Sequence, residues 1–150
     1  MEVEAVHKDN YEFEFKAREH SFFLDGTSIN GIKERGPTPK EALLSAIIGC
    51  SGMDVFSLLK KYNVSYSSFK LKAIANLTKE HPKVFPQIEI QYHFQTDHSD
   101  QSKIIEAITL SMTKYCGVSA MISKSAPIYY KIFINDEVHL DSEANFENIV

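Results

Sequence analysis

Cysteine is scarce in this chain, which has two, Cys50 and Cys116, among 150 residues. Two thiols are too few for a zinc site built from cysteine alone, and the six histidines show no HxxxH spacing. We therefore predict no metal and no cofactor. Structural disulfides are rare in the reducing cytosol, so a purely structural disulfide between the two cysteines is not expected.

Basic clusters and long hydrophobic runs are also missing. The net charge is −4, and lysine and arginine do not gather into the basic patch that nucleic-acid binding requires. The uncharged run at residues 42–53 is shorter than the roughly 20 residues of a membrane span, and Asp54 follows it. The start of the chain, MEVEAV, is alternating and acidic, unlike a signal peptide. We expect a soluble cytoplasmic protein without nucleic-acid or membrane partners.

One long helix is predicted at residues 37–62, and the rest of the chain is organised around it. Thr38 suits the N-cap, Pro39 suits the first helical position, and Glu41 stands at the spacing of a capping box. Apolar residues occur on every side of this helix, so we expect it to be buried in the middle of the fold.

Alternation of apolar and polar residues predicts strands on both sides of the long helix. Because these strands are grouped rather than alternating with helices, we predict an α+β fold with antiparallel sheets. The expected segments are strands at 2–8, 11–16 and 21–25, a loop at 26–37, strands at 69–77 and 88–94, a helix at 101–115, a short helical turn at 118–122 and a strand at 127–134.

The length of the chain fits a single domain, which we place at residues 1–135. Residues 136–150 are acidic and weakly patterned. We predict that they form a loosely attached tail.

The two cysteines are the candidates for chemistry. Free cysteine is among the most buried residue types, so composition alone favours both as small core residues. A redox function requires a thiolate, and Cys116 precedes a helical turn whose free N–H groups would lower its pKa. Asp54 lies one turn after Cys50 on the same helix face. We expect Asp54 to accept a hydrogen bond from the Tyr115 hydroxyl or from a backbone N–H near Cys116.

Two segments, GPTPKEALLSAIIGCSGMDV and KYCGVSAMI, resemble the cysteine motifs of the OsmC/Ohr family (osmotically inducible protein C and organic hydroperoxide resistance protein). The likeness covers most of residues 1–135. It implies an intertwined homodimer whose sheets wrap around two long central helices. Active members reduce organic hydroperoxides, so the resemblance implies that Cys50 is oxidised to a sulfenic acid and that Cys116 resolves it as a disulfide. A dithiol reductant, in the best-known members a lipoylated protein, would then restore both thiols.

The chain departs from the active members at two supporting positions. Those members carry a glutamate ten positions before the first cysteine, where this chain has Lys40, with Glu41 one position away. They also carry an arginine in the N-terminal hairpin, and residues 8–11 contain none. The chain therefore resembles a subgroup without the Arg/Glu pair. We expect Asp54, Glu41 and Lys40 to support the site.

Three functions follow from these observations. The first is a thiol peroxidase for organic hydroperoxides that protects against oxidative stress. The second, which the missing arginine and glutamate favour, is a non-enzymatic dimeric binding module for an apolar small molecule, with inert cysteines. The third is a redox sensor that engages a partner protein through a Cys50–Cys116 disulfide. The candidate apolar residues to line a cleft at the dimer interface, most of which ordinary core packing would explain equally well or better, are Phe13, Phe22, Phe23, Met53 and Phe56.

Overall fold

The computed structural model describes residues 1–26 and 33–146 of the chain. Its contacts divide the chain into two compact units, Met1–Ser45 and Ala46–Val150. The loop predicted at 26–37 falls partly on residues 27–32, which lie outside the described residues.

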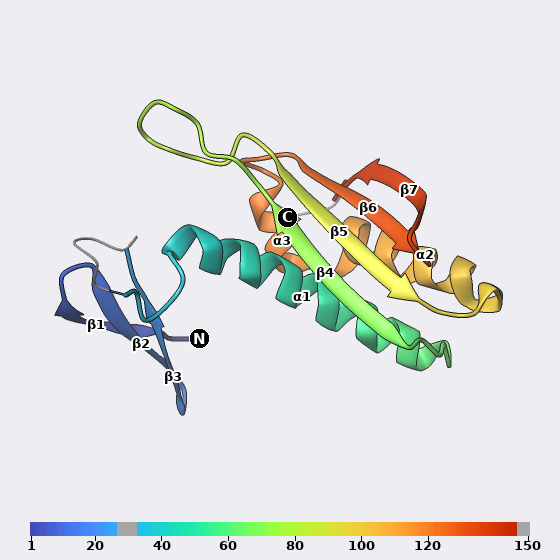
Figure 1. Cartoon of the computed structure of the whole chain (residues 1–150), viewed down its shortest axis with the longest axis horizontal. Helices are drawn as coiled ribbons and strands as arrows, with labels where there is room; N and C mark the ends of the chain where they lie inside the picture. The colour runs from blue at the N-terminus through green and yellow to red at the C-terminus, as the bar shows by residue number, and fades with distance from the viewer. Residues whose placement is uncertain (27–32, 147–150) are drawn as a thin grey trace. The chain divides into compact units, whose positions relative to one another are not determined.

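The first unit contains a three-stranded antiparallel sheet in the order β1-β2-β3 (Figure 1). The strands are β1 (Glu4–Asp9), β2 (Glu12–Ala17) and β3 (His20–Leu24), close to the predicted positions. Asn10 and Arg18 take positive φ angles of 48° and 55° in the two turns between them. Asparagine tolerates this left-handed conformation better than most residues, which suits it to a tight turn.

The predicted long helix is confirmed as α1 (Pro39–Lys61), which begins in the first unit and continues in the second. Its N-terminus is closed by a reciprocal capping box. The Thr38 N–H donates to Glu41 Oε2 at 2.7 Å, and the Glu41 N–H donates to Thr38 Oγ1 at 3.4 Å. These bonds satisfy N–H groups that have no partner inside the helix.

Within the second unit, α1 buries a single stripe of residues rather than its whole circumference. The buried positions recur every four residues, which places them on one helix face. The prediction that α1 is covered on all sides is therefore wrong for the single chain, because the side chains of Met53 and Phe56 are 72% and 52% exposed. The buried residues of the stripe are Ile47, Ser51, Val55 and Leu59.

The second unit holds a four-stranded sheet in the order β4-β5-β6-β7 (Figure 1). The strands are β4 (Ser68–Ile74), β5 (Ile88–Gln95), β6 (Ile128–Ile134) and β7 (Glu137–Glu143). The prediction of antiparallel sheets is wrong for β5 and β6, which pair in parallel. The chain between them is helical, and such a crossover returns it to the end from which β5 started.

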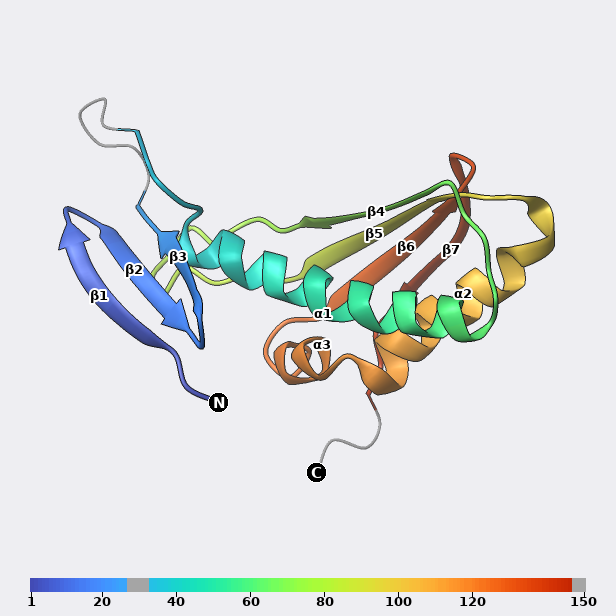
Figure 2. The ribbon, with the colours of Figure 1, turned by 90° about the horizontal axis from the view of Figure 1, so that it is seen from below.

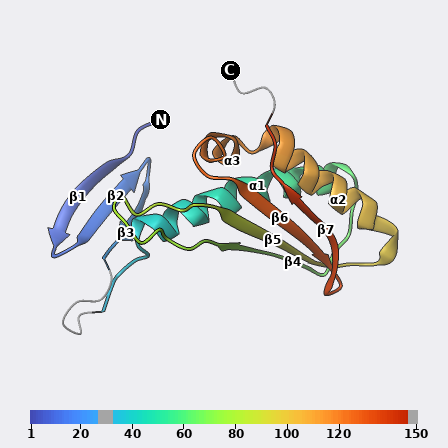
Figure 3. The same ribbon diagram turned by 90° about the horizontal axis from the view of Figure 1, so that it is seen from above.

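That crossover consists of η1 (His98–Asp100), α2 (Gln101–Leu110), the π-helical turn η2 (Ser111–Tyr115) and α3 (Gly117–Ile122). Figure 2 shows α1, α2 and α3 on one face of the sheet, and Figure 3 shows its strands side by side. Alternate residues of β5 and β6 are buried, as expected for strands covered on one face. Each fully buried aliphatic side chain contributes about 1.5–3 kcal/mol. The buried residues are Ile88, Ile90, Tyr92, Phe94, Ile128, Tyr130, Ile132 and Ile134.

The prediction of a loosely attached tail is wrong for most of residues 136–146. β7 pairs antiparallel with β6 over most of its length, and Ala144 and Phe146 beyond it are buried. An unpaired β6 edge would leave backbone N–H and C=O groups without partners, and β7 satisfies them. Residues 147–150 lie outside the described residues.

Among the described residues, α1 is the one helix long and apolar enough to cross a membrane by length and composition. Core helices of soluble proteins share these properties. Gly52 of α1 lies close to the sheet, since a Cβ at this position would be 3.2 Å from Leu71 Cδ1 of β4. α1 is thus packed against protein on this side.

Candidate functional site

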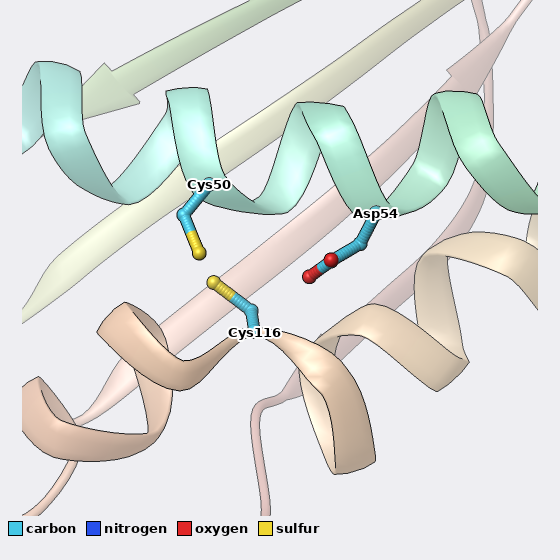
Figure 4. Close-up of side chains that lie close together, drawn as sticks. All are labelled: Cys50, Asp54 and Cys116. Atoms are coloured by element: carbon cyan, nitrogen blue, oxygen red, sulfur yellow. The ribbon is translucent and has the colours of Figure 1, made fainter.

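The two cysteines, far apart in sequence, come together in the second unit. Cys50 and Asp54 lie one turn apart on α1 and are half-buried, whereas Cys116 is fully buried between η2 and α3. The two Sγ atoms and a carboxylate oxygen of Asp54 all lie within 4.8 Å of one another. Figure 4 shows the two sulfur atoms facing each other, with the Asp54 carboxylate pointing into the same space.

The π-helical turn positions Cys116. The Cys116 N–H donates to the Ser111 carbonyl oxygen at 3.0 Å, five residues back rather than four. Such one-turn widenings are frequent at functional sites. Cys116 then leaves the helix with φ −69° and ψ 97° and becomes the N-cap of α3. The predicted helix at 101–115 is thus regular only as far as Leu110.

A chain of buried hydroxyl groups runs beside the cysteines. The Tyr92 hydroxyl of β5 is hydrogen-bonded to the Ser51 hydroxyl of α1. Ser51 Oγ lies 3.0 Å from Ser111 Oγ, and Ser111 Oγ donates to Asp54 Oδ2 at 3.4 Å. Sequence reasoning missed this network. The available signal was a serine within the apolar stripe of each of two helical segments, since buried hydroxyl groups need partners.

The predicted partner of Asp54 is therefore wrong. The hydrogen bond that Asp54 accepts comes from the Ser111 hydroxyl, one π-turn before Tyr115. Tyr115 is itself 48% exposed. Burial raises the pKa of the Asp54 carboxyl, and the bond from Ser111 opposes this shift.

Cys116 accepts the predicted hydrogen bond from a backbone N–H, and also one from a hydroxyl that was not predicted, but its pKa is not lowered. Its sulfur accepts from the Ser119 N–H at 3.4 Å and from the Ser119 hydroxyl at 3.0 Å. Both bonds favour the thiolate, yet burial outweighs them and raises the pKa of Cys116 to about 11. The prediction of a lowered pKa is thus wrong, because the sulfur is removed from water more completely than the sequence indicates.

The remaining predicted residues, Lys40 and Glu41, belong to the first unit, ten and nine positions before Cys50. The Glu41 carboxylate accepts bonds from the backbone N–H and the hydroxyl of Thr38, and these bonds lower its pKa. Glu41 thus acts as a helix cap. Lys40 is exposed on the first turn of α1.

The apolar residues predicted to line a cleft are mostly exposed in the single chain. Phe23 differs, because the Arg35 guanidinium carbon lies 3.9 Å from the centre of its ring. Arg35 also pairs with Glu12 at 3.1 Å. The exposed fractions of the other four are 41% for Phe13, 43% for Phe22, 72% for Met53 and 52% for Phe56.

Comparison with known proteins identifies the family. The family model described as OsmC-like protein matches residues 32–131, two thirds of the chain. This chain belongs to the OsmC-like family. The predicted resemblance is therefore confirmed, and so is the α+β fold.

Individual relatives of this OsmC-like protein agree with the assignment. It is 30% identical to protein YhfA of Escherichia coli K12 over 109 residues, and the aligned region covers 73% of this chain and 78% of YhfA. A hypothetical protein from Aquifex aeolicus VF5 has a TM-score of 0.77 at 28% identity, covering 89% of this chain and 95% of that one. The organic hydroperoxide resistance protein OhrB of Bacillus subtilis has a TM-score of 0.58 at 16% identity, and the match covers 89% of this chain and 96% of OhrB. The likeness to OhrB shows a shared fold.

Proposed function

We propose that this OsmC-like protein is a thiol peroxidase that reduces organic hydroperoxides in defence against oxidative stress. The observation that carries the proposal is the approach of Cys50 Sγ and Cys116 Sγ to within 4.8 Å. A disulfide bond is about 2.0 Å long, so a modest shift of the two side chains would join them. Membership of the OsmC-like family, which includes hydroperoxide resistance proteins, supports the same reaction.

Exposure distinguishes the roles of the two cysteines. Cys50 is half-buried and Cys116 is fully buried, so a hydroperoxide from solvent reaches Cys50 first. The Cys50 thiolate attacks the terminal oxygen of ROOH, the O–O bond breaks, and RO⁻ takes up a proton to leave as ROH. The Cys116 sulfur then attacks the Cys50 sulfenic acid, which forms the disulfide and releases water.

Asp54 supports the second step. At neutral pH Cys116 holds its proton, and this proton must leave when its sulfur attacks Cys50. The Asp54 carboxylate is within 4.8 Å of both sulfur atoms and is positioned to receive it. An external dithiol, of the type carried by lipoylated proteins, then reduces the disulfide by thiol exchange.

The protein acts as a soluble homodimer in this proposal. The apolar side chains of Met53 and Phe56 on α1 and of Met121 on α3 are more than half exposed in the single chain. A second copy of the chain would cover them, which places two α1 helices at the centre as the family resemblance implies.

Light scattering after gel filtration without detergent tests the dimer. The wild-type protein should have twice the chain mass. Met53→Lys should shift the mass toward that of one chain because it buries an unpaired charge in the interface. Lys61→Ser, at the end of the same helix, is the matched control and should remain dimeric. A monomeric wild-type protein would contradict the proposal.

Turnover tests the enzyme. Purified protein, cumene hydroperoxide and dihydrolipoamide are mixed, and loss of hydroperoxide is followed over time. Cys50→Ser should abolish turnover, whereas Cys116→Ser should accumulate a sulfenic acid at Cys50 that dimedone traps. Glutathione in place of the dithiol should support much slower turnover. Turnover that survives Cys50→Ser would refute the assignment.

One observation favours a second candidate function, a dimeric binding module for an apolar small molecule. Among the described residues, the Glu41 carboxylate is engaged at the helix cap and Arg35 is engaged by Glu12 and Phe23. The glutamate and the arginine of the family's peroxidases are missing from the expected positions of this chain. Glu41 and Arg35, which carry the same groups nearby in sequence, make other contacts. Thiols that survive a large excess of hydroperoxide would favour the binding module.

A further inference from the structure

Three metal-binding donors converge at the cysteine site. The sulfur atoms of Cys50 and Cys116 and a carboxylate oxygen of Asp54 lie within 4.8 Å of one another. A tetrahedral zinc ion with Zn–S bonds of about 2.3 Å and Zn–O bonds of about 2.0–2.2 Å separates neighbouring donors by roughly 3.4–3.8 Å. The three donors therefore need to close by no more than about 1.4 Å to share one ion. Figure 4 shows all three pointing into the same space.

The helix supplies two of the donors in a favourable arrangement. Cys50 and Asp54 are four residues apart on α1, which places their side chains on the same face, one turn apart. Cys116 approaches from the opposite side at the start of α3. Thiolate ligands select soft or borderline cations such as zinc rather than magnesium or calcium.

Two of the donors are also held by a second layer of hydrogen bonds. The Ser119 hydroxyl donates to Cys116 Sγ at 3.0 Å, and the Ser111 hydroxyl donates to Asp54 Oδ2 at 3.4 Å. Metal ligands are commonly oriented by such outer partners, and their loss weakens metal binding by about 10- to 100-fold.

The donor set suits a cation. A metal ion displaces the thiol protons when it binds, so the donors that face the bound ion carry three negative charges. Within the described part of the chain, no lysine or arginine forms an ion pair with Asp54. A divalent ion would neutralise most of this charge without any basic side chain.

We propose that the reduced protein binds one zinc ion per chain through Cys50 Sγ, Cys116 Sγ and the Asp54 carboxylate, with water in the fourth position. Binding replaces the two S–H protons, which pass to solvent, and zinc remains Zn²⁺ throughout. The sequence prediction of no metal considered local spacing, and these donors come from segments far apart in the chain.

Zinc and oxidation exclude each other at this site. A zinc-bound thiolate pair cannot form the disulfide, and the disulfide removes two of the three ligands. Zinc would therefore keep both thiols reduced, and oxidation of the thiols would release the zinc ion. This consequence uses the site of the proposed function, but zinc binding itself does not depend on peroxidase activity.

Zinc chloride titrated into reduced, chelator-treated protein tests the proposal, with a chromophoric chelator as competitor. One ion should bind per chain. Cobalt chloride should give thiolate-to-cobalt charge-transfer bands and the visible bands of a tetrahedral ion. Asp54→Asn, which keeps the side-chain shape, should weaken zinc binding at least about tenfold. Cys116→Ser should remove the charge-transfer contribution of one thiolate. Glu106→Gln, a surface change on α2, is the matched control and should bind zinc as the wild type does.

Oxidation of the cysteines with diamide rather than a peroxide separates this proposal from the proposed function. Diamide should release the zinc in step with disulfide formation, even if the protein reduces no hydroperoxide. Absence of stoichiometric binding, or binding that survives both Cys50→Ser and Cys116→Ser unchanged, would overturn the zinc site. A peroxidase that binds no zinc would leave the proposed function standing alone.

Discussion

Ser51 Oγ of α1 lies 3.0 Å from Ser111 Oγ of the π-helical turn, in the buried seam between the two segments that carry the cysteines. Ser51 directly follows Cys50, and Ser111 accepts the Cys116 N–H through its carbonyl oxygen. This one contact therefore joins the two segments that carry the cysteines.

Removing the Ser111 hydroxyl should change both stability and the charge of Asp54. Ser111→Ala leaves Asp54 without its donor, so the pKa of Asp54 should rise further above its usual range. The free energy of unfolding should fall by about 1–3 kcal/mol, as for the loss of a buried hydrogen bond. Urea unfolding measures the stability, and carbon-detected NMR of the aspartate carboxyl groups follows the titration.

Ser102→Ala provides the matched control for this change. Ser102 is exposed on α2, so its loss should alter the free energy of unfolding by less than about 0.5 kcal/mol. Equal losses of unfolding free energy for the two substitutions would show that the buried hydroxyl chain stabilises the fold no more than an exposed hydroxyl does.

The acidity of Cys116 is a second prediction. Burial raises the pKa of Cys116 to about 11, so less than about a tenth of it should be thiolate at pH 10. In protein labelled with ¹³C at the cysteine Cβ, the Cys116 signal should stay near its thiol position up to that pH. A midpoint below pH 9 would contradict the description of this site.

The same pKa shift makes the stability of the fold depend on pH. The folded chain holds the Cys116 proton more tightly than the unfolded chain, because the folded pKa is raised. Its contribution to stability is complete below the unfolded pKa and is lost as the pH rises from about 9 toward 11. In the Cys116→Ala variant, the melting temperature should therefore fall less steeply with rising pH in this range than it does in the wild type.

The C-terminal segment should contribute to stability despite its acidic composition. Phe146 is 8% exposed, and Phe146→Ala should lower the free energy of unfolding by about 3 kcal/mol. Val138→Ala on β7 is the control, since Val138 is 60% exposed and should cost less than about 0.5 kcal/mol. Urea unfolding of both variants measures the difference, and similar losses would argue that Phe146 is not packed.

Much of the fold follows from local sequence patterns. The capping box at Thr38 and Glu41 predicts the start of α1, and strict alternation predicts β2 and β5 to within two residues. The resemblance of the two cysteine motifs to the OsmC/Ohr family implies the pairing of Cys50 and Cys116, whose sulfur atoms lie within 4.8 Å of each other in the structure. These features depend on residues close in sequence or on a motif that spans both segments.

Features that depend on tertiary contacts were not predictable in this way. The π-helical turn at Ser111 meets Ser51 from a distant helix, and no local pattern marks it. The pairing of β7 depends on the free edge of β6 rather than on the weak alternation of β7 itself. The raised pKa of Cys116 reflects how completely its sulfur is buried, which hydrogen-bond geometry alone does not indicate.

The central claim is that Cys50 and Cys116 form a redox pair, and mass spectrometry tests it most directly. Reduced protein is treated with one equivalent of cumene hydroperoxide, quenched with an alkylating agent and digested. We predict a mass loss of about 2 Da, no alkylated cysteine, and a disulfide-linked peptide joining Cys50 to Cys116 within one chain. Two alkylated thiols, or a disulfide between Cys50 residues of different chains, would contradict the account.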